Sequence, residues 1–193
     1  MKDRTKLWDE THFQKELEKL PPRLQQDIQN IPFKKTTKEL TDTFIYGTTG
    51  TGKTVQAVHM MLNELRNCFV RRYHTVGTFI SVPELLLEFK NSYNKQNGEE
   101  GKTEADLVNY YGSIKILVLD DIGVERTTDW AFQLLYIIIN RRYENMLQTV
   151  FTSNISLNEL AGKLKDDRIP ARIQQMCTIV KSKDVNYRVR EGG

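Results

Sequence analysis

The chain has 193 residues, of which 39% are hydrophobic and 27% are charged, and its formal net charge at pH 7 is +3. This length suits one well-buried α/β domain with a short appendage, and the small positive charge permits an acidic partner such as nucleic acid without requiring one. No window holds the roughly 18 apolar residues of a membrane helix, and the polar opening MKDRTKLWDE is unlike a signal peptide, so we expect a cytoplasmic protein without membrane contact.

Residues 1–40 differ in pattern from the rest of the chain. The segment HFQKELEKLPPRLQQDIQNIPF places apolar residues at helical spacing, and Pro21 and Pro22 interrupt it, which predicts two short helices. We interpret 1–40 as an N-terminal helical arm, either a docking element for a partner or a structural collar. Residues 41–193 then form the main domain.

Strand-like and helix-like segments alternate from Thr43 onward. Apolar or β-branched runs at TFIYG, TVGTFISV, IKILVLDD, QTVFTSN and CTIVKS predict five strands. Segments with helical spacing, such as VQAVHMMLNELRN and WAFQLLYIIINRRYEN, separate several of them. Strands that alternate with helices pair in parallel through right-handed crossovers, so the predicted fold class is α/β with a parallel sheet.

A phosphate-binding loop is predicted between the first strand and the following helix. The segment GTTGTGKT matches G-x-x-x-x-G-K-[ST] in full. Its glycines let backbone N–H groups turn toward phosphates, Lys53 can reach the β and γ phosphates of ATP, and the Thr54 hydroxyl can enter a Mg²⁺ shell. The predicted nucleotide-binding residues are Gly47, Thr48, Thr49, Gly50, Thr51, Gly52, Lys53, Thr54 and Val55.

Polar side chains follow two of the predicted strands. Asp120 and Asp121 end the buried run ILVLDD, at the edge where open parallel sheets bind ligands. We expect Asp120 to hold Mg²⁺ and Asp121 to polarise the attacking water. Asn154, at the end of TSN, can orient that water or sense the γ phosphate. The alternatives are an acidic turn for the two carboxylates and an ordinary turn residue for the asparagine.

Arginines that can neutralise charge on a transferring phosphoryl group occur in two later segments. Arg168 and Arg172 lie four residues apart in DDRIPARI, and Arg188 and Arg190 lie in NYRVR. The alternative is that these arginines belong to solvated helix faces.

The ordered set GTTGTGKT, ILVLDDIG, TSN, DDRIPARI and NYR resembles the DnaC/IstB-like branch of AAA+ ATPases, especially bacterial and phage replicative helicase loaders. The similarity covers residues 44–190. It implies a P-loop NTPase AAA+ core whose five parallel strands lie in the order 5-1-4-3-2, flanked by helices and without a full C-terminal lid domain. It also implies that copies of the chain assemble with ATP between subunits.

The resemblance assigns roles to individual residues. Lys53 resembles the Walker A lysine, Asp120 the Walker B metal ligand and Asn154 sensor 1. Arg172 resembles the arginine finger that one subunit donates to its neighbour's ATP, and Arg188 resembles sensor 2.

The sequence departs from many AAA+ ATPases in two respects. Asp121 stands where they carry a glutamate, and because the aspartate side chain is one methylene shorter, we expect slow hydrolysis. The larger N-terminal domain of cellular loaders has no counterpart here, so docking to a partner is expected to fall to residues 1–40.

DNA contacts in this family lie after the second strand, where this chain reads ELLLEFKNSYNK. Aromatic and basic side chains suit base stacking and phosphate contact. The residues predicted to bind DNA are Phe89, Lys90, Tyr93 and Lys95. Phe89, four residues after Leu85, fits a core position equally well.

The resemblance implies an ATP-dependent helicase loader. Such a protein assembles on Mg-ATP and places a replicative DnaB-type helicase on single-stranded DNA. Three alternatives remain, namely an IstB-like transposition ATPase that acts on duplex DNA, a small P-loop kinase, and a switch that binds ATP without hydrolysing it.

Overall fold

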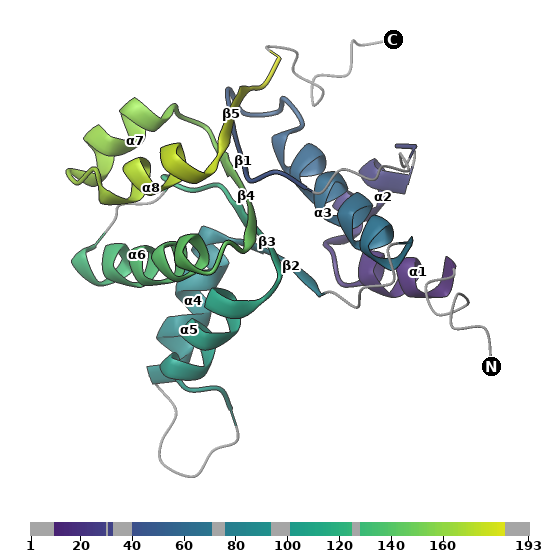
Figure 1. Ribbon diagram of the computed structural model, residues 1–193, viewed down its shortest axis with the longest axis horizontal. Coiled ribbons are helices and arrows are strands. Elements are labelled where there is room, and N and C mark those ends of the chain that lie inside the picture. Colours follow the sequence, from purple (N-terminus) through teal and green to yellow (C-terminus); the bar gives the residue numbers. More distant parts are fainter. Residues whose placement is uncertain are drawn as a thin grey trace.

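A five-stranded parallel sheet lies between two layers of helices (Figure 1). The computed structural model describes residues 10–29, 31–32, 40–70, 76–93, 101–124 and 128–183. The strands are β1 (Thr43–Tyr46), β2 (Gly77–Ser81), β3 (Ile116–Asp120), β4 (Gln148–Ser153) and β5 (Thr178–Lys181). Their order is β2-β3-β4-β1-β5 and every pair is parallel, which confirms the predicted order.

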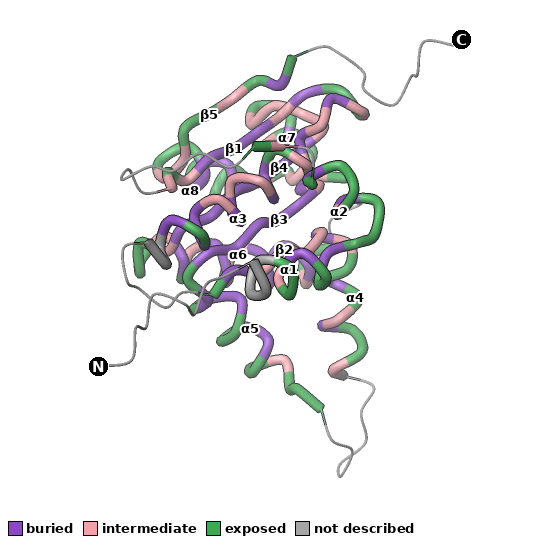
Figure 2. The backbone as a smooth tube through the Cα atoms, turned by 90° about the vertical axis from the view of Figure 1, so that its right-hand side faces the viewer, coloured by how far each residue is buried: buried purple, intermediate pink, exposed green. Residues whose placement is uncertain are grey.

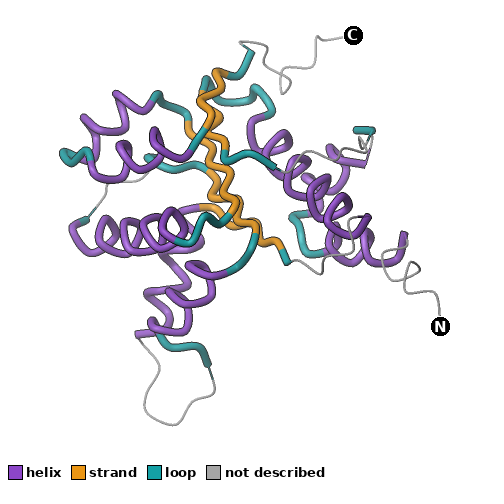
Figure 3. The backbone as a smooth tube through the Cα atoms, viewed as in Figure 1, coloured by secondary structure: helices purple, strands orange, loops and turns teal. Residues whose placement is uncertain are grey.

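The helices divide between the two faces of the sheet (Figure 3). One face carries α1 (Glu10–Glu18), α2 (Pro22–Gln29) and α3 (Lys53–Val70). The other carries α4 (Val82–Tyr93), α5 (Glu104–Ser113), α6 (Asp129–Glu144), α7 (Leu157–Leu164) and α8 (Arg168–Met176). None of the described helices is both long and apolar enough to cross a membrane.

Each face of the sheet has its own hydrophobic core. Successive side chains of a strand point to opposite faces, and β3 shows this directly. Leu117 and Leu119 belong to the cluster beneath α4–α8, whereas Ile116 and Val118 belong to the cluster beneath α1–α3. All residues of β3 and β4 are buried, while most of β5 is exposed at the edge of the sheet (Figure 2).

The two N-terminal helices contribute to the second core. Leu17, Leu20, Leu24 and Ile28 are buried in the cluster that also contains Ala57, Val58 and Leu62 of α3. Leu17 lies on α1, Leu24 and Ile28 lie on α2, and Leu20 lies in the turn between the two predicted helices. In their packing, α1 and α2 act as a collar on α3.

Helix α5 was not among the predicted elements. Thr103 caps its N-terminus by accepting a hydrogen bond from the Asp106 backbone N–H, and the Asp106 side chain accepts one from the Thr103 backbone N–H. This reciprocal pair uses an aspartate where the usual capping box has Glu or Gln. The sequence TEAD therefore lacks the usual signature of a helix start, and it follows a polar, glycine-bearing segment that is typical of a loop.

The strand order places a topological switch point at the carboxyl ends of β1 and β4. These strands are neighbours, yet the helix after β1 (α3) and the helix after β4 (α7) lie on opposite faces of the sheet. Open α/β sheets bind their ligands where neighbouring connections diverge in this way.

Candidate nucleotide-binding and hydrolysis site

The predicted phosphate loop joins β1 to α3 at this switch point. Gly50 and Gly52 have φ angles of 88° and 77°, in the left-handed region that only glycine adopts without strain. Helix α3 begins at Lys53, so the positive end of its dipole lies at the loop. The backbone therefore has the features of an anion site.

Lys53 is buried at the centre of the loop, with 5% of its surface exposed. Its Nζ donates to the carbonyl oxygens of Gly47 at 2.9 Å and Thr48 at 2.8 Å. It also donates to Oδ1 of Asn154 at 3.0 Å. The ammonium group is thus held beside the carboxyl ends of both β1 and β4, where it can meet a phosphate.

Asp120, the last residue of β3, is 6% exposed and accepts hydrogen bonds on both carboxylate oxygens. Thr54 Oγ1 donates to Oδ2 at 3.1 Å, and Thr152 Oγ1 donates to Oδ1 at 2.6 Å. Burial raises the pKa of Asp120 and the neighbouring charge of Asp121 raises it further, while the two hydroxyl bonds and Lys53 oppose these effects. This carboxylate would be stabilised in its charged form by a cation.

The residues beside Asp120 fit a Mg²⁺ ion. Thr54 and Asp120 supply a hydroxyl and a carboxylate oxygen within 3.1 Å of each other. Mg²⁺ prefers oxygen ligands and is commonly bound by one or two protein groups together with substrate phosphates and water. The donor set matches that mode.

Asp121 and Asn154 meet at the carboxyl ends of β3 and β4. Asn154 Nδ2 donates to Asp121 Oδ1 at 3.3 Å, while its Oδ1 accepts from Lys53. Asp121 has a φ of 59°, a left-handed conformation that aspartate tolerates better than most residues. The structure thus brings together Lys53, Asp121 and Asn154, the three residues predicted to act on the γ phosphate.

Sequence reasoning missed Thr152. This side chain is fully buried in β4, two residues before Asn154 and on the same face of the strand. Its hydroxyl donates to Asp120 and accepts from the backbone N–H of Asp121. In the sequence TSN, Thr152 and Asn154 are two residues apart and so share a face in an extended chain. The pairing of β4 with β3 was needed to see that Thr152 lies beside Asp120 and Asp121.

The described contacts of Arg168 and Arg172 are with residues outside the phosphate loop. The Arg172 guanidinium lies 4.6 Å from the ring centre of Tyr143, and it donates to Asn140 and Gln175. Arg168 pairs with Asp166 at 2.8 Å. Arg188 and Arg190 lie outside the residues that the structure describes.

One predicted DNA contact is wrong. Phe89 is fully buried in the core beneath α4–α8, so its ring is not exposed for stacking on a base. Lys90 is exposed on α4, and the exposed apolar side chain of that helix is Leu87, at 56%. Tyr93 is the last residue of α4, and its side chain is not among the described parts of the structure. Lys95 lies outside the described residues altogether.

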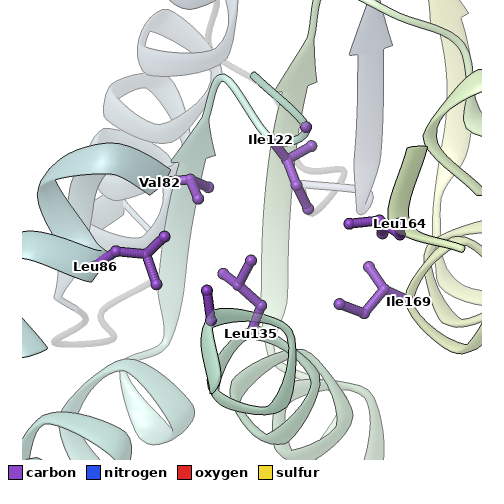
Figure 4. A pocket seen from close by; sticks show the side chains of 8 residues that line it. Val82, Leu86, Ile122, Leu135, Leu164 and Ile169 are labelled. Carbon is purple, nitrogen blue, oxygen red and sulfur yellow. The ribbon is translucent and has the colours of Figure 1, made fainter. Parts of the chain in front are cut away.

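A small pocket lies apart from the phosphate loop, between α4, α6 and the α7–α8 pair (Figure 4). It is lined by Val82, Leu86, Ile122, Gly123, Ala131, Leu135, Leu164 and Ile169. These side chains are apolar and offer no group to orient a phosphate. The pocket is a gap in the hydrophobic core and not a second nucleotide site.

Sequence comparisons relate the chain to known proteins. The family model described as IstB-like ATP binding protein matches residues 2–192. The replicative helicase loader DnaI of Bacillus subtilis (strain 168) is 32% identical over 118 residues, which cover 61% of this chain and 34% of DnaI. The phage-like element PBSX protein XkdC of the same strain is 26% identical over 140 residues, which cover 69% of this chain and 47% of XkdC. The chain spans less than half the length of these relatives.

Solved structures of AAA+ proteins share the fold. A crystal structure of the DnaC helicase loader has a TM-score of 0.61 at 22% identity and covers 91% of this chain and 100% of its own. A crystal structure of DnaI has a TM-score of 0.58 at 22% identity, with 89% of each chain covered. The predicted P-loop AAA+ core is thereby confirmed. Because the family model matches nearly the whole sequence, the chain belongs to the IstB-like ATP-binding proteins, in the IstB/DnaC-like branch of AAA+ ATPases.

Proposed function

We propose that this protein is an ATP-dependent helicase loader that places a replicative DnaB-type helicase on single-stranded DNA. Members of its family bind and hydrolyse ATP, and DnaI, which it resembles, is a replicative helicase loader. The observation that carries the proposal is the connected set Lys53–Asn154–Asp121, which links the phosphate loop to the carboxylates at the end of β3.

The chain's own groups suit hydrolysis of the γ phosphate. Lys53 and the backbone of the loop bind the phosphates, and Thr54 and Asp120 hold Mg²⁺, which neutralises charge on the phosphates when it is bound. Asn154 orients Asp121, whose carboxylate accepts a proton from the attacking water. The short reach of Asp121 makes the expected turnover slow.

Assembly and partner binding complete the proposal. The described hydrogen-bond partners of Arg172 are Asn140 and Gln175, which lie outside the phosphate loop of the same chain. This favours action of Arg172 on the ATP of a neighbouring copy. We assign docking of the helicase to residues 1–40, where the surface of α1 and α2 that faces away from the core is available, because their apolar face is already buried. Lys90 is the described candidate for DNA contact.

The function is tested by steady-state ATPase measurements across protein concentration, with and without single-stranded DNA. A loader with shared sites is expected to show specific activity that rises with concentration and with DNA. A second assay measures how fast a DnaB-type helicase unwinds a forked DNA that is coated with single-strand-binding protein, with and without this protein. A flat rate, no gain in unwinding, or transfer of the γ phosphate to a small acceptor would contradict the proposal.

The finger assignment makes a separate prediction. Replacement of Arg172 by alanine is expected to leave ATP affinity within about twofold and to lower kcat by about 10³-fold, the scale of an arginine finger. Mixing Arg172→Ala with Lys53→Ala subunits should restore part of the activity, because a mixed interface joins an intact phosphate loop to an intact finger. Arg168→Ala is the matched control, since Arg168 lies one turn away on α8. An inactive mixture would rule out action between subunits.

A second function is favoured by one observation. The family model that spans 2–192 is named for IstB-like proteins, and the transposition ATPases of that kind act on duplex DNA. Tighter binding to duplex than to single-stranded DNA, together with no binding to a DnaB-type helicase, would select this alternative.

A further inference from the structure

We infer that Thr152 is a positioning residue that sets the orientation of both carboxylates at the end of β3. The inference rests on the proposed ATPase function, because it assigns work to Asp120 and Asp121. The Thr152 side chain is fully buried, so its hydroxyl has only protein groups to bond with. It lies 2.6 Å from Asp120 Oδ1 and 2.9 Å from the Asp121 backbone nitrogen.

The direction of each hydrogen bond follows from the groups involved. A hydroxyl has one hydrogen to donate and two lone pairs that accept. The Asp121 N–H can only donate and the ionised Asp120 carboxylate can only accept, so the Thr152 hydrogen points to Asp120. The Thr152 side chain therefore bonds the last residue of β3 and the residue that follows it, with no alternative arrangement of its hydrogen.

The first bond fixes the Asp120 carboxylate. The terminal torsion of an aspartate is broad and roughly two-fold, so an unrestrained carboxylate samples many orientations. With Oδ1 held by Thr152, Oδ2 is turned toward Thr54 Oγ1, at 3.1 Å. That is the side on which Mg²⁺ would lie. The hydroxyl thus presents a metal ligand without touching the metal.

The second bond stabilises Asp121. This residue has a φ of 59°, which costs free energy for a residue with a side chain. The Thr152 hydroxyl accepts from its N–H at that point, and the carboxylate of Asp121 is then within 3.3 Å of Asn154 Nδ2. Thr152 on β4 thus bonds the backbone of Asp121, and Asn154, the residue after β4, bonds its side chain.

The end of β3 does not depend on this hydroxyl alone. The backbone N–H of Ile122 donates to the Thr152 carbonyl at 2.9 Å, a bond that survives any side-chain substitution. Valine has nearly the shape of threonine, so Thr152→Val removes the two hydroxyl bonds while filling the same space. We therefore expect the variant to fold and to lose orientation of the carboxylates.

The test compares Thr152→Val, Thr152→Ser and wild type by Mg²⁺ titration of a protein-bound fluorescent ATP analogue. We expect Thr152→Val to bind the analogue in EDTA within about twofold of wild type, and to need about 10- to 100-fold more Mg²⁺ for half-saturation, the scale of a lost outer-shell bond. Its kcat should fall by a similar factor. Thr152→Ser, which keeps the hydroxyl, should stay within about threefold of wild type.

Thr43→Val is the matched control, because Thr43 is also a buried strand threonine, 4% exposed, whose hydroxyl donates to the Thr41 carbonyl. It should leave the Mg²⁺ dependence unchanged. If Thr152→Val fails to fold, Thr152→Ala against Thr152→Ser isolates the same hydroxyl. Equal Mg²⁺ dependence for variants with and without the hydroxyl overturns the inference.

Amide hydrogen exchange separates this inference from the proposed function. Loss of the hydroxyl is expected to speed exchange at the Asp121 N–H by at least about tenfold, a readout that needs neither ATP nor turnover. If the wild-type protein shows no Mg²⁺-dependent binding or turnover, the proposed function is wrong. The positioning role of Thr152 still stands in that case if exchange at the Asp121 N–H depends on the hydroxyl. Unchanged exchange would count against the positioning role itself.

Discussion

Replacement of Lys53 by alanine is expected to lower kcat for ATP by at least about 10²-fold, the effect of removing one preorganised donor from a developing charge. Lys53 Nζ is held by the carbonyl groups of Gly47 and Thr48 and by Asn154, so the ammonium group is aligned before ATP arrives. The substitution also removes the shorter of two hydrogen bonds to Asn154 Oδ1 and leaves the one from the Thr49 hydroxyl at 3.4 Å, so we expect Asn154 to be held less firmly beside Asp121. Both effects act on the γ phosphate.

Turnover and binding are measured separately to check this result. Affinity for a fluorescent ATP analogue should fall as well, because Lys53 contributes to phosphate binding in the ground state. Lys115→Ala is the control, since Lys115 is exposed and lies just before β3, at the opposite end of the strand from Asp120. Turnover by Lys53→Ala above a tenth of the wild-type value would contradict the assigned role.

Replacement of Arg142 by methionine is expected to destabilise the fold by about 3–5 kcal/mol, as when one partner of a buried charged network is removed. Arg142 is fully buried in α6 and makes four hydrogen bonds of 2.6–2.9 Å. Its acceptors are the carbonyl oxygens of Tyr111, Ile114 and Gln148 and the Thr149 hydroxyl. The guanidinium therefore joins α6 to the end of α5 and the start of β4.

The charge of Arg142 remains at neutral pH. Burial lowers its pKa to about 10, and the nearby Asp42 carboxylate limits that fall. Methionine matches the length of the side chain but leaves three buried carbonyl groups without their donor, and each costs about 1–3 kcal/mol. The lost contacts of Arg142 do not involve the nucleotide-binding residues, so the Arg142→Met molecules that remain folded should keep their affinity for ATP.

Urea denaturation followed by circular dichroism measures the change in the free energy of unfolding. The control is Arg141→Met at the adjacent position, where the exposed arginine makes a hydrogen bond to Asn109, and it should cost less than about 0.5 kcal/mol. Similar unfolding free energies for the two variants would show that the four bonds of Arg142 add little to stability.

Local patterns predicted the parts of the site that depend on neighbours in sequence. GTTGTGKT has the glycines and lysine that a phosphate loop requires, and the run ILVLDD places Asp120 at the end of a buried strand. Asn154 lies beside Lys53 and Asp121 because β4 lies between β1 and β3 in the sheet. The resemblance to AAA+ ATPases supplied the order, which no residue pattern contains.

Residues that act across the sheet could not be predicted in the same way. Thr152 and Arg142 gain their roles from partners about 30 residues away, and pairing at that distance depends on register and on helix orientation. Phe89 shows the opposite error, since an aromatic residue among lysines suits a DNA surface, but its position four residues after Leu85 turns it into the core. Composition does not distinguish the two faces of a helix.

The placement of β1 in the sheet also bears on how the chain acquires its structure. β2 and β3 can pair once the first 120 residues exist, whereas β1 has only β4 and β5 as neighbours, and Thr43 pairs with Val150 and Thr178. Contacts between such distant segments carry a large loop-closure entropy and form slowly. During synthesis, the phosphate loop emerges early on a strand that has no partner until β4 follows. We therefore expect nucleotide binding to be a late event in folding, since the loop is held in place only after β4 has been made.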